Sequence, residues 1–206
     1  MNFSYIYPPR PETKIAPTSL DIFDKMFIYL AEPKLNGSSM EIYINGKDIK
    51  IMNRHKEPIV CKIDKSELLA LHRSDGQMIF CGEYMNKNQK DETDNLWNHK
   101  YVIWDIIMYN GKHLLGTTFE DRYRLLKTLY PDKLVKKHLH QISENCFRVN
   151  CVIRGFKEVF DDISKYDIYE GLVLKRVDGK LENGTTADNN TRTQIKCRKP
   201  TLNYNF

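Results

Sequence analysis

Short apolar segments that end at tight-turn signals recur along this chain, and they constrain its fold more than any other feature. Asn45-Gly46 separates two alternating segments within residues 27–54, and Asn110-Gly111 ends the dense apolar segment at 101–109. Asn-Gly is favoured in two-residue hairpin turns because both turn positions need a positive φ. Further segments of this kind lie at 77–85, 146–153, 168–175 and 194–199. The sequence therefore predicts a strand-rich α+β fold with mainly antiparallel sheets.

Helices are indicated at fewer places. Residues 118–129 follow a capping threonine and carry an apolar stripe at helical spacing, which predicts an amphipathic helix. Shorter helices are expected at 66–73 and 155–164. The first 19 residues are rich in proline, which favours an extended path over the surface. We expect a single domain over residues 1–206, with 1–19 as an extended N-terminal segment.

The charge and cysteine content narrow the class of protein only slightly. Lys and Arg number 32 against 27 Asp and Glu, so the net charge of +5 permits a polyanionic partner without requiring one. Five cysteines with no CxxC pair argue against a disulfide framework and favour a reducing compartment. The sequence shows neither a signal peptide nor an apolar run long enough to span a membrane. We expect a cytoplasmic protein, in the host cytoplasm if the chain is viral, with no membrane partner.

Six short motifs that mix charged and strand-forming residues follow one another along the chain. Lys34 opens the first of them and stands between apolar residues where a strand-like segment meets a glycine turn. In chain order the motifs are KLNG (34–37), IKIMNRH (49–55), FCGEYM (80–85), YVIWDIIMYNGK (101–112), EGLVLKR (170–176) and QIKCRKP (194–200). Each motif alone is a weak signal, and their order makes the pattern specific.

In this order the motifs resemble those of the covalent nucleotidyltransferases, which include the ATP-dependent DNA and RNA ligases and the mRNA capping enzymes. KLNG is similar to the family's KxDG, FCGEYM to its DGE-type motif, EGLVLKR to EGxVxK, and QIKCRKP to a Lys-x-Lys/Arg before proline. The resemblance runs from about residue 27 to the C-terminus. It implies the nucleotidyltransferase fold, which is ATP-grasp-like and has mainly antiparallel sheets flanked by helices.

The resemblance gives the first and last motifs the catalytic roles. Lys34 is expected to attack the α-phosphorus of ATP and become a lysyl-AMP, a reaction that needs an unprotonated amine. Lys196 and Arg198 lie two residues apart on one strand face, so both are expected to reach the α-phosphate. Asn36 and Gly37 complete the nucleotide-binding turn, where Gly37 would let the backbone approach the nucleotide.

The remaining roles concern the base, the ribose and a metal ion. Glu32 matches a glutamate that reads the adenine amino group in several DNA ligases, and Tyr101 is expected to stack on the base with Trp104 as its neighbour. The other cofactor-binding residues are expected to be Arg54 and Glu83 at the ribose or phosphates, and Lys175. Glu170, with Glu83, is expected to hold Mg²⁺ or Mn²⁺ through carboxylate oxygens.

Two departures from the family pattern leave the substrate open. Asn36 replaces the Asp of KxDG, and Ser39 stands where DNA ligases and capping enzymes carry an arginine, which resembles one large group of RNA ligases. The stretches AEPK, MNRH and FEDRYRLL resemble DNA ligases instead. The chain stops a few residues after the last motif, so no OB-fold domain is expected.

The resemblance implies an ATP-dependent polynucleotide ligase. Such an enzyme would transfer AMP to a 5′-phosphate end and seal it to a 3′-hydroxyl, with a nicked duplex or RNA ends as its partner and a monomer as its state. Two alternatives stay open, a guanylyltransferase that caps RNA and a non-catalytic nucleic-acid-binding protein that has kept the fold. Glu32 argues against the first, because a carboxylate suits adenine better than guanine.

Overall fold

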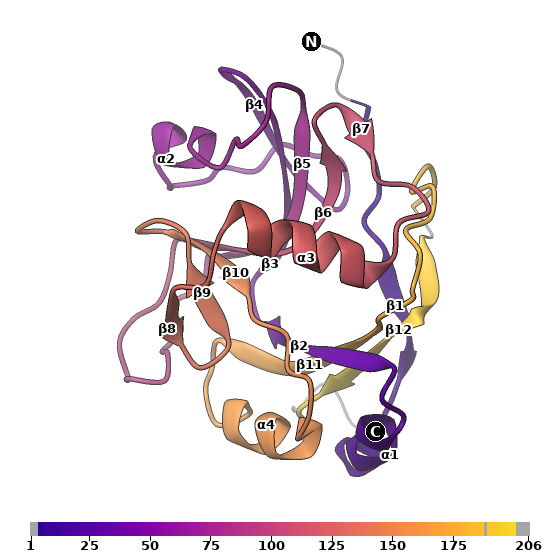
Figure 1. Cartoon of the computed structure of the whole chain (residues 1–206). Coiled ribbons are helices and arrows are strands. Elements are labelled where there is room, and N and C mark those ends of the chain that lie inside the picture. Colours follow the sequence, from indigo (N-terminus) through magenta and orange to yellow (C-terminus); the bar gives the residue numbers. More distant parts are fainter. Residues whose placement is uncertain (1–3, 188, 201–206) are drawn as a thin grey trace.

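The computed structural model describes residues 4–187 and 189–200, which form two β-sheets with short helices around them (Figure 1). The helices are α1 (Leu20–Lys25), α2 (Lys65–Leu69), α3 (Phe119–Leu129) and α4 (Phe156–Ile163), with a 3₁₀ turn at Pro17–Ser19. The strands are β1 (Arg10–Lys14), β2 (Tyr29–Leu35), β3 (Ser38–Asn45), β4 (Asp48–Asn53), β5 (Met78–Met85), β6 (Lys100–Tyr109), β7 (Lys112–His113), β8 (Leu134–Lys136), β9 (Leu139–Gln141), β10 (Cys146–Val149), β11 (Tyr169–Arg176) and β12 (Asn190–Arg198).

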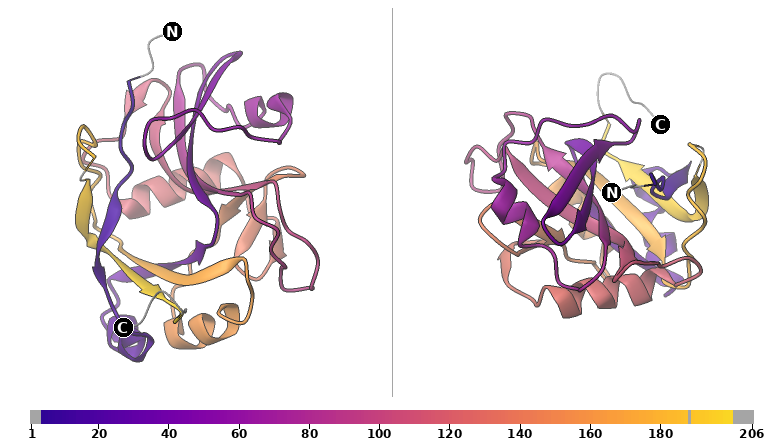
Figure 2. Two further views of the ribbon diagram at one scale, coloured as in Figure 1. Left: turned by 180° about the vertical axis from the view of Figure 1, so that it is seen from behind. Right: turned by 90° about the horizontal axis from the view of Figure 1, so that it is seen from above.

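The two sheets have different sizes and meet through the short connection between β2 and β3. The smaller has the strand order β1-β12-β11-β2, and the larger runs β4-β3-β5-β6-β10-β9-β8 with β7 added beside β6. Most neighbouring strands are antiparallel, whereas β1 is parallel to β12 and β10 is parallel to β6. Figure 2 shows the sheets facing each other from two further directions. The predicted α+β class with mainly antiparallel sheets is confirmed, and the described residues contain no OB-fold barrel.

Local sequence signals explain several of these elements. The β3–β4 hairpin pairs Asn45 with Asp48, so its turn falls at Gly46, whose φ of 60° suits glycine. Thr118 caps α3 and forms a capping box with Asp121, which satisfies backbone N–H groups at both ends of the box. The sequence predicted the hairpin and the helix, but the turn residues are Gly46 and Lys47 rather than Asn45 and Gly46, because Asn45 still pairs with Asp48 as part of β3.

Two large hydrophobic clusters hold the sheets in place. One packs β2 and β11 against α1 and α4 through residues such as Leu20, Phe156 and Leu172. The other packs the larger sheet against α2 and α3 through residues such as Phe80 and Leu126. Helices therefore pack against each sheet on the face that points away from the other sheet. This packing holds in place the strands whose side chains point toward the other sheet.

The N-terminal segment is part of the smaller sheet. The sequence suggested that residues 1–19 run extended over the surface, but Arg10–Lys14 form β1 and pair with β12, and Pro8 and Pro9 are buried. Among the described residues, no helix is both long enough and apolar enough to cross a membrane.

Candidate active site

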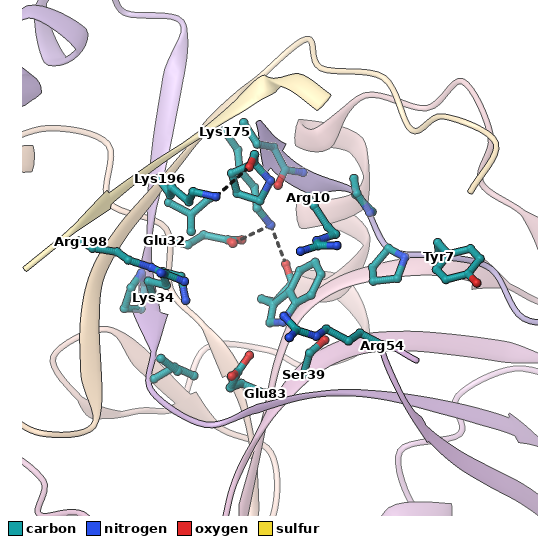
Figure 3. A pocket seen from close by; sticks show the side chains of 18 of the residues that line it. Tyr7, Arg10, Glu32, Lys34, Ser39, Arg54, Glu83, Lys175, Lys196 and Arg198 are labelled. Carbon is teal, nitrogen blue, oxygen red and sulfur yellow. Dashed lines mark hydrogen bonds and ion pairs between the residues drawn. The ribbon is translucent and has the colours of Figure 1, made fainter. Parts of the chain in front are cut away.

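A pocket lies between the facing sheets, and most of the predicted site residues line it (Figure 3). The smaller sheet contributes one wall through β2, β11 and β12, and the larger sheet contributes the opposite wall through β3, β5 and β6. Six cationic side chains and two carboxylates line it: Arg10, Lys34, Arg54, Lys175, Lys196 and Arg198, with Glu32 and Glu83. This excess of positive charge suits a ligand that carries several negative charges.

Lys34 reaches the pocket because of its place on β2. Side chains alternate along a strand, so Glu32 and Lys34 point to the same face, and both line the pocket. The Lys34 Nζ donates a hydrogen bond to Glu170 Oε2 over 2.5 Å, and its side chain is 20% exposed. The lysine is therefore held in a fixed position and remains accessible to a ligand.

Glu170 faces Lys34 because β11 is irregular at this point. Val173 and Lys175 point into the pocket, so regular alternation would turn Glu170 to the opposite face. The pairing of β11 with β2 shifts register between Tyr169 and Gly171, and such a bulge redirects a side chain. The Glu170 carboxylate thereby meets both Lys34 and Arg198 Nε, the latter at 3.2 Å.

The strand register aligns the basic residues across the smaller sheet. Lys34 on β2 and Arg198 on β12 both pair with Gly171, which lies between them on β11. A Cβ on Gly171 would lie 2.1 Å from the Cys197 carbonyl oxygen, and its φ is 138°, so the position requires glycine. No side chain at position 171 therefore separates Lys34 from Arg198, and the Glu170 carboxylate contacts both of them.

Lys196 lies among several other cations of the smaller sheet and the pocket. Burial lowers its pKa, and the charges of Arg198, Lys14, Arg10 and Lys34 lower it further. Its Nζ donates to the Pro11 carbonyl oxygen at 3.3 Å. An anion bound beside Lys196 would relieve this repulsion, which favours anion binding at this point.

Glu32 and Lys175 form a buried ion pair at the floor of the pocket. Their charged atoms are 2.6 Å apart and each side chain is only 3% exposed. Burial raises the pKa of Glu32 to about 7, and Lys175 opposes that rise. The Lys175 Nζ also donates to the Trp104 carbonyl oxygen at 3.2 Å and lies 4.9 Å from the centre of the indole ring. The pair fixes the side chains of this part of the pocket relative to each other.

Glu83 and Arg54 lie on the opposite wall. Burial raises the pKa of Glu83 to about 7; the Lys34 charge opposes this rise and the Glu170 charge adds to it. Arg54 lies just after β4, its side chain is exposed, and its Nε donates to His55 Nε2 at 3.1 Å. Figure 3 shows both side chains at the edge of the cavity, where a ribose or a phosphate would be within reach.

The carboxylates of Glu83 and Glu170 are the residues that fit a divalent metal ion. They are close enough that the charge of Glu170 raises the pKa of Glu83, and carboxylate oxygens are the ligands that Mg²⁺ prefers. Within residues 4–187 and 189–200, no group of three or more His, Cys, Asp or Glu side chains could hold a metal. A Mg²⁺ at this point would complete its shell with water and substrate phosphates, as is usual for this ion.

The structure places Tyr101 outside the pocket, which corrects the prediction that it stacks on a base. Its ring is fully buried on the other face of the larger sheet, and its hydroxyl donates to the carbonyl oxygens of Met40 and Phe80. Trp104 lines the pocket instead, at a register shift between β5 and β6. Trp104 lies three positions after Tyr101, so strand alternation places the two side chains on opposite faces.

Asn36 and Gly37 do not line the pocket either. The Asn36 side chain donates to the Asp167 carbonyl oxygen at 3.1 Å and accepts from Lys87 at 2.9 Å. A Cβ on Gly37 would lie 2.5 Å from the Tyr84 carbonyl oxygen, so this glycine allows the chain to cross β5. The turn of the KLNG motif therefore connects β2 to β3, and Lys34 and Leu35 are the residues of the motif that line the pocket.

Sequence reasoning missed the contribution of the N-terminal segment. Residues 7–11 line one side of the pocket and add Arg10 to its charged residues. Gly184 permits this placement, since a Cβ there would lie 2.2 Å from the Tyr7 carbonyl oxygen. The proline content of this segment indicates a rigid backbone. It does not indicate where in the fold the segment lies.

A family model described as ATP-dependent DNA ligase domain matches residues 61–192. The matched range includes Glu83, Trp104, Glu170 and Lys175, and it excludes Lys34 at one end and Lys196 at the other. No curated protein sequence matches the chain.

Several solved structures share the fold. A mycobacterial DNA ligase D complexed with ATP is 16% identical with a TM-score of 0.59, over 82% of this chain and 54% of that chain. A structure from an analysis of Lig E DNA ligases is 14% identical with a TM-score of 0.53, and the match covers 84% of this chain and 62% of that chain. A Chlorella virus DNA ligase-adenylate is 18% identical with a TM-score of 0.51, over 91% and 67%. This chain thus spans about half the length of the mycobacterial structure, and the likeness concerns the fold.

Proposed function

Because the chain belongs to the family of ATP-dependent DNA ligase domains, we propose that it uses ATP to adenylylate its own Lys34 and passes the AMP to a nucleic-acid 5′-phosphate. The observation that carries this proposal is the position of the Lys34 amine. It contacts Glu170 at 2.5 Å, faces Arg198 across Gly171, and opens into a pocket with an excess of cations.

The proposed first step is an attack by Lys34 Nζ, as the free amine, on the α-phosphorus of ATP. A nitrogen–phosphorus bond forms, the bond from that phosphorus to the bridging oxygen breaks, and pyrophosphate leaves with the electron pair, while the nitrogen gives up one proton to the solvent. Lys196 and Arg198 line the pocket with Lys34, and their charges would stabilise the charge that develops on the α-phosphate. Glu170 positions the amine before the attack through its hydrogen bond.

The base is proposed to lie at the floor of the pocket. Trp104 offers a ring face for stacking in place of Tyr101, and Val173 lines the pocket from the opposite sheet. Glu32 presents a carboxylate acceptor that suits the amino group of adenine, in an orientation fixed by Lys175. Arg54 and Glu83 are proposed to contact the ribose and phosphates.

Mg²⁺ or Mn²⁺ would neutralise phosphate charge when bound, and Glu83 and Glu170 are the residues proposed to hold it. The two carboxylates influence each other electrostatically, which supports this pairing.

The proposed acceptor is nucleic acid with adjacent 5′-phosphate and 3′-hydroxyl ends, which the enzyme would seal after AMP transfer. Membership of a DNA ligase family favours a nicked DNA duplex over RNA ends. We propose that the chain acts as a cytoplasmic monomer in one domain.

Incubation with α-labelled ATP or GTP and Mg²⁺ tests the proposal, with acid-stable label on the protein as the readout. Labelling by ATP and not GTP is expected. Labelling by GTP alone would indicate a capping guanylyltransferase, and absence of labelling with either nucleotide would indicate a non-catalytic protein. Sealing of nicked DNA, nicked RNA and single-stranded RNA, compared side by side, would then identify the acceptor.

A further inference from the structure

The basic residues of the smaller sheet extend beyond the motif residues, onto β1. The strand order is β2-β11-β12-β1, so β1 lies next to β12 and farthest from β2. Lys14 on β1 pairs directly with Lys196 on β12 in a parallel register. Directly paired residues of neighbouring strands point to the same face of a sheet, so Lys14 and Lys196 share the face that carries Lys34.

The electrostatics of Lys196 show that Lys14 is close to it. Lys14 is the second largest of the charges that lower the pKa of Lys196, after Arg198. Lys14 is exposed at the end of β1, and neighbouring strands are about 4.8 Å apart. The cations therefore lie in series across the sheet, with Lys34 first, Lys196 and Arg198 next, and Lys14 last.

The backbone around Lys14 is held in place. The Ile15 N–H donates to the Lys196 carbonyl oxygen at 3.0 Å, and the Lys196 Nζ donates to the Pro11 carbonyl oxygen at 3.3 Å. Each strand thus fixes the other on both sides of Lys14. Two lysines that repel each other are kept side by side, an arrangement that an anion between them would stabilise.

We propose that Lys14 binds the β- and γ-phosphates of ATP and the pyrophosphate that leaves. This inference rests on the proposed function, in which Lys34 attacks the α-phosphorus. In phosphoryl transfer the attacking and leaving atoms lie roughly in line, so the leaving group departs on the side away from Lys34. Across the smaller sheet that direction passes β12 and reaches β1, where Lys14 is the cation beside Lys196.

The test measures both directions of the first step in the full chain. In Lys14→Ala, the KM for ATP in self-labelling and the pyrophosphate concentration needed to discharge the labelled protein should both rise about tenfold, the effect of losing one charge-assisted hydrogen bond. AMP binding should stay unchanged, because AMP has no β-phosphate. Lys14→Arg should restore most of both values, and the effects should shrink at high salt.

The control variant is Lys47→Ala, which removes the same charge from an exposed position in the β3–β4 turn of the other sheet. Its values should equal those of the unaltered chain. An unchanged ATP and pyrophosphate dependence in Lys14→Ala overturns the proposal, and so does an equal effect in Lys47→Ala. Weaker binding of a nicked duplex with unchanged pyrophosphate dependence would assign Lys14 to nucleic-acid phosphates and overturns it as well. Failure of the unaltered chain to label with ATP would overturn the proposed function first, and this inference with it.

Discussion

Replacing Lys175 with methionine tests whether the Glu32–Lys175 ion pair organises the floor of the pocket. Methionine keeps much of the apolar stem, which lies beside the rings of Trp104 and Phe119. It removes the charge that lies 2.6 Å from Glu32. The Glu32 carboxylate, which is 3% exposed, would then be buried without its cation.

The expected loss follows from that burial. Removing one partner of a buried ion pair costs about 3–5 kcal/mol of unfolding free energy. For a domain of this size each kcal/mol moves the melting temperature by about 2–4 °C, so Tm should fall by roughly 6–20 °C.

The loss of unfolding free energy in Lys175→Met should also depend on pH, and it should be larger at the higher pH. Burial raises the pKa of Glu32 to about 7 from its ordinary value of 4.5, and loss of Lys175 should raise it further. Between pH 4.5 and the raised pKa, the folded state binds more protons than the unfolded state. The free energy of unfolding therefore falls as the pH rises through this range. The destabilisation should therefore be larger near pH 8 than near pH 5.5, where the carboxyl group is neutral in both proteins.

Urea unfolding followed by tryptophan fluorescence, at both pH values, measures these differences. The double variant Glu32→Met with Lys175→Met is the control, because it removes both charges and should recover most of the loss. The reasoning is refuted if Lys175→Met is as stable as the parent near pH 8. The reasoning would also be refuted if the double variant lost as much unfolding free energy as the two single variants lose together.

Two further predictions concern the reaction itself. Glu170→Ala should slow self-labelling about a hundredfold, since misplacement of a reacting group by about 1 Å can cost that much. The affinity for ATP should fall by a smaller factor. Normal labelling rates at ordinary Mg²⁺ would reject the role of Glu170. Trp104→Ala should weaken ATP and GTP by similar factors, roughly fivefold to a hundredfold for one lost stacking contact, as measured by nucleotide titration. Tyr101→Leu, which removes the other ring, should leave both affinities of the folded protein unchanged, and an effect there instead of at Trp104 would reverse the assignment.

Features of the site that depend on regular alternation could be predicted from the sequence. Glu32 and Lys34 share a strand face, as do Lys196 and Arg198, and the structure places all four in the pocket. The resemblance to the family motifs singles out these residues, and the period of a β-strand then predicts that each pair shares a face.

Features that depend on irregular strands could not be predicted in this way. The bulge at Glu170 redirects its carboxylate to Lys34, and a bulge has no clear signature in a single sequence. The stacking role was assigned to Tyr101 because its motif position matched the family, although alternation and a register shift place Trp104 in the pocket.

The place of β1 was also beyond local sequence reasoning. Arg10 and Lys14 pair with residues about 180 positions later in the chain, and an edge strand rich in proline resembles an extended surface segment. The long-range pairing of β1 with β12 brings Arg10 to the pocket and Lys14 beside Lys196.

The most direct test of the account is to map the modified residue after incubation with ATP and Mg²⁺. The account predicts that peptide mapping by mass spectrometry finds AMP on Lys34 alone, and that Lys34→Ala stays unlabelled while it melts like the parent. Lys62→Ala, the control at the other lysine in a KxD-like sequence, should label normally. AMP found on Lys62, or on any other residue in Lys34→Ala, would contradict the account.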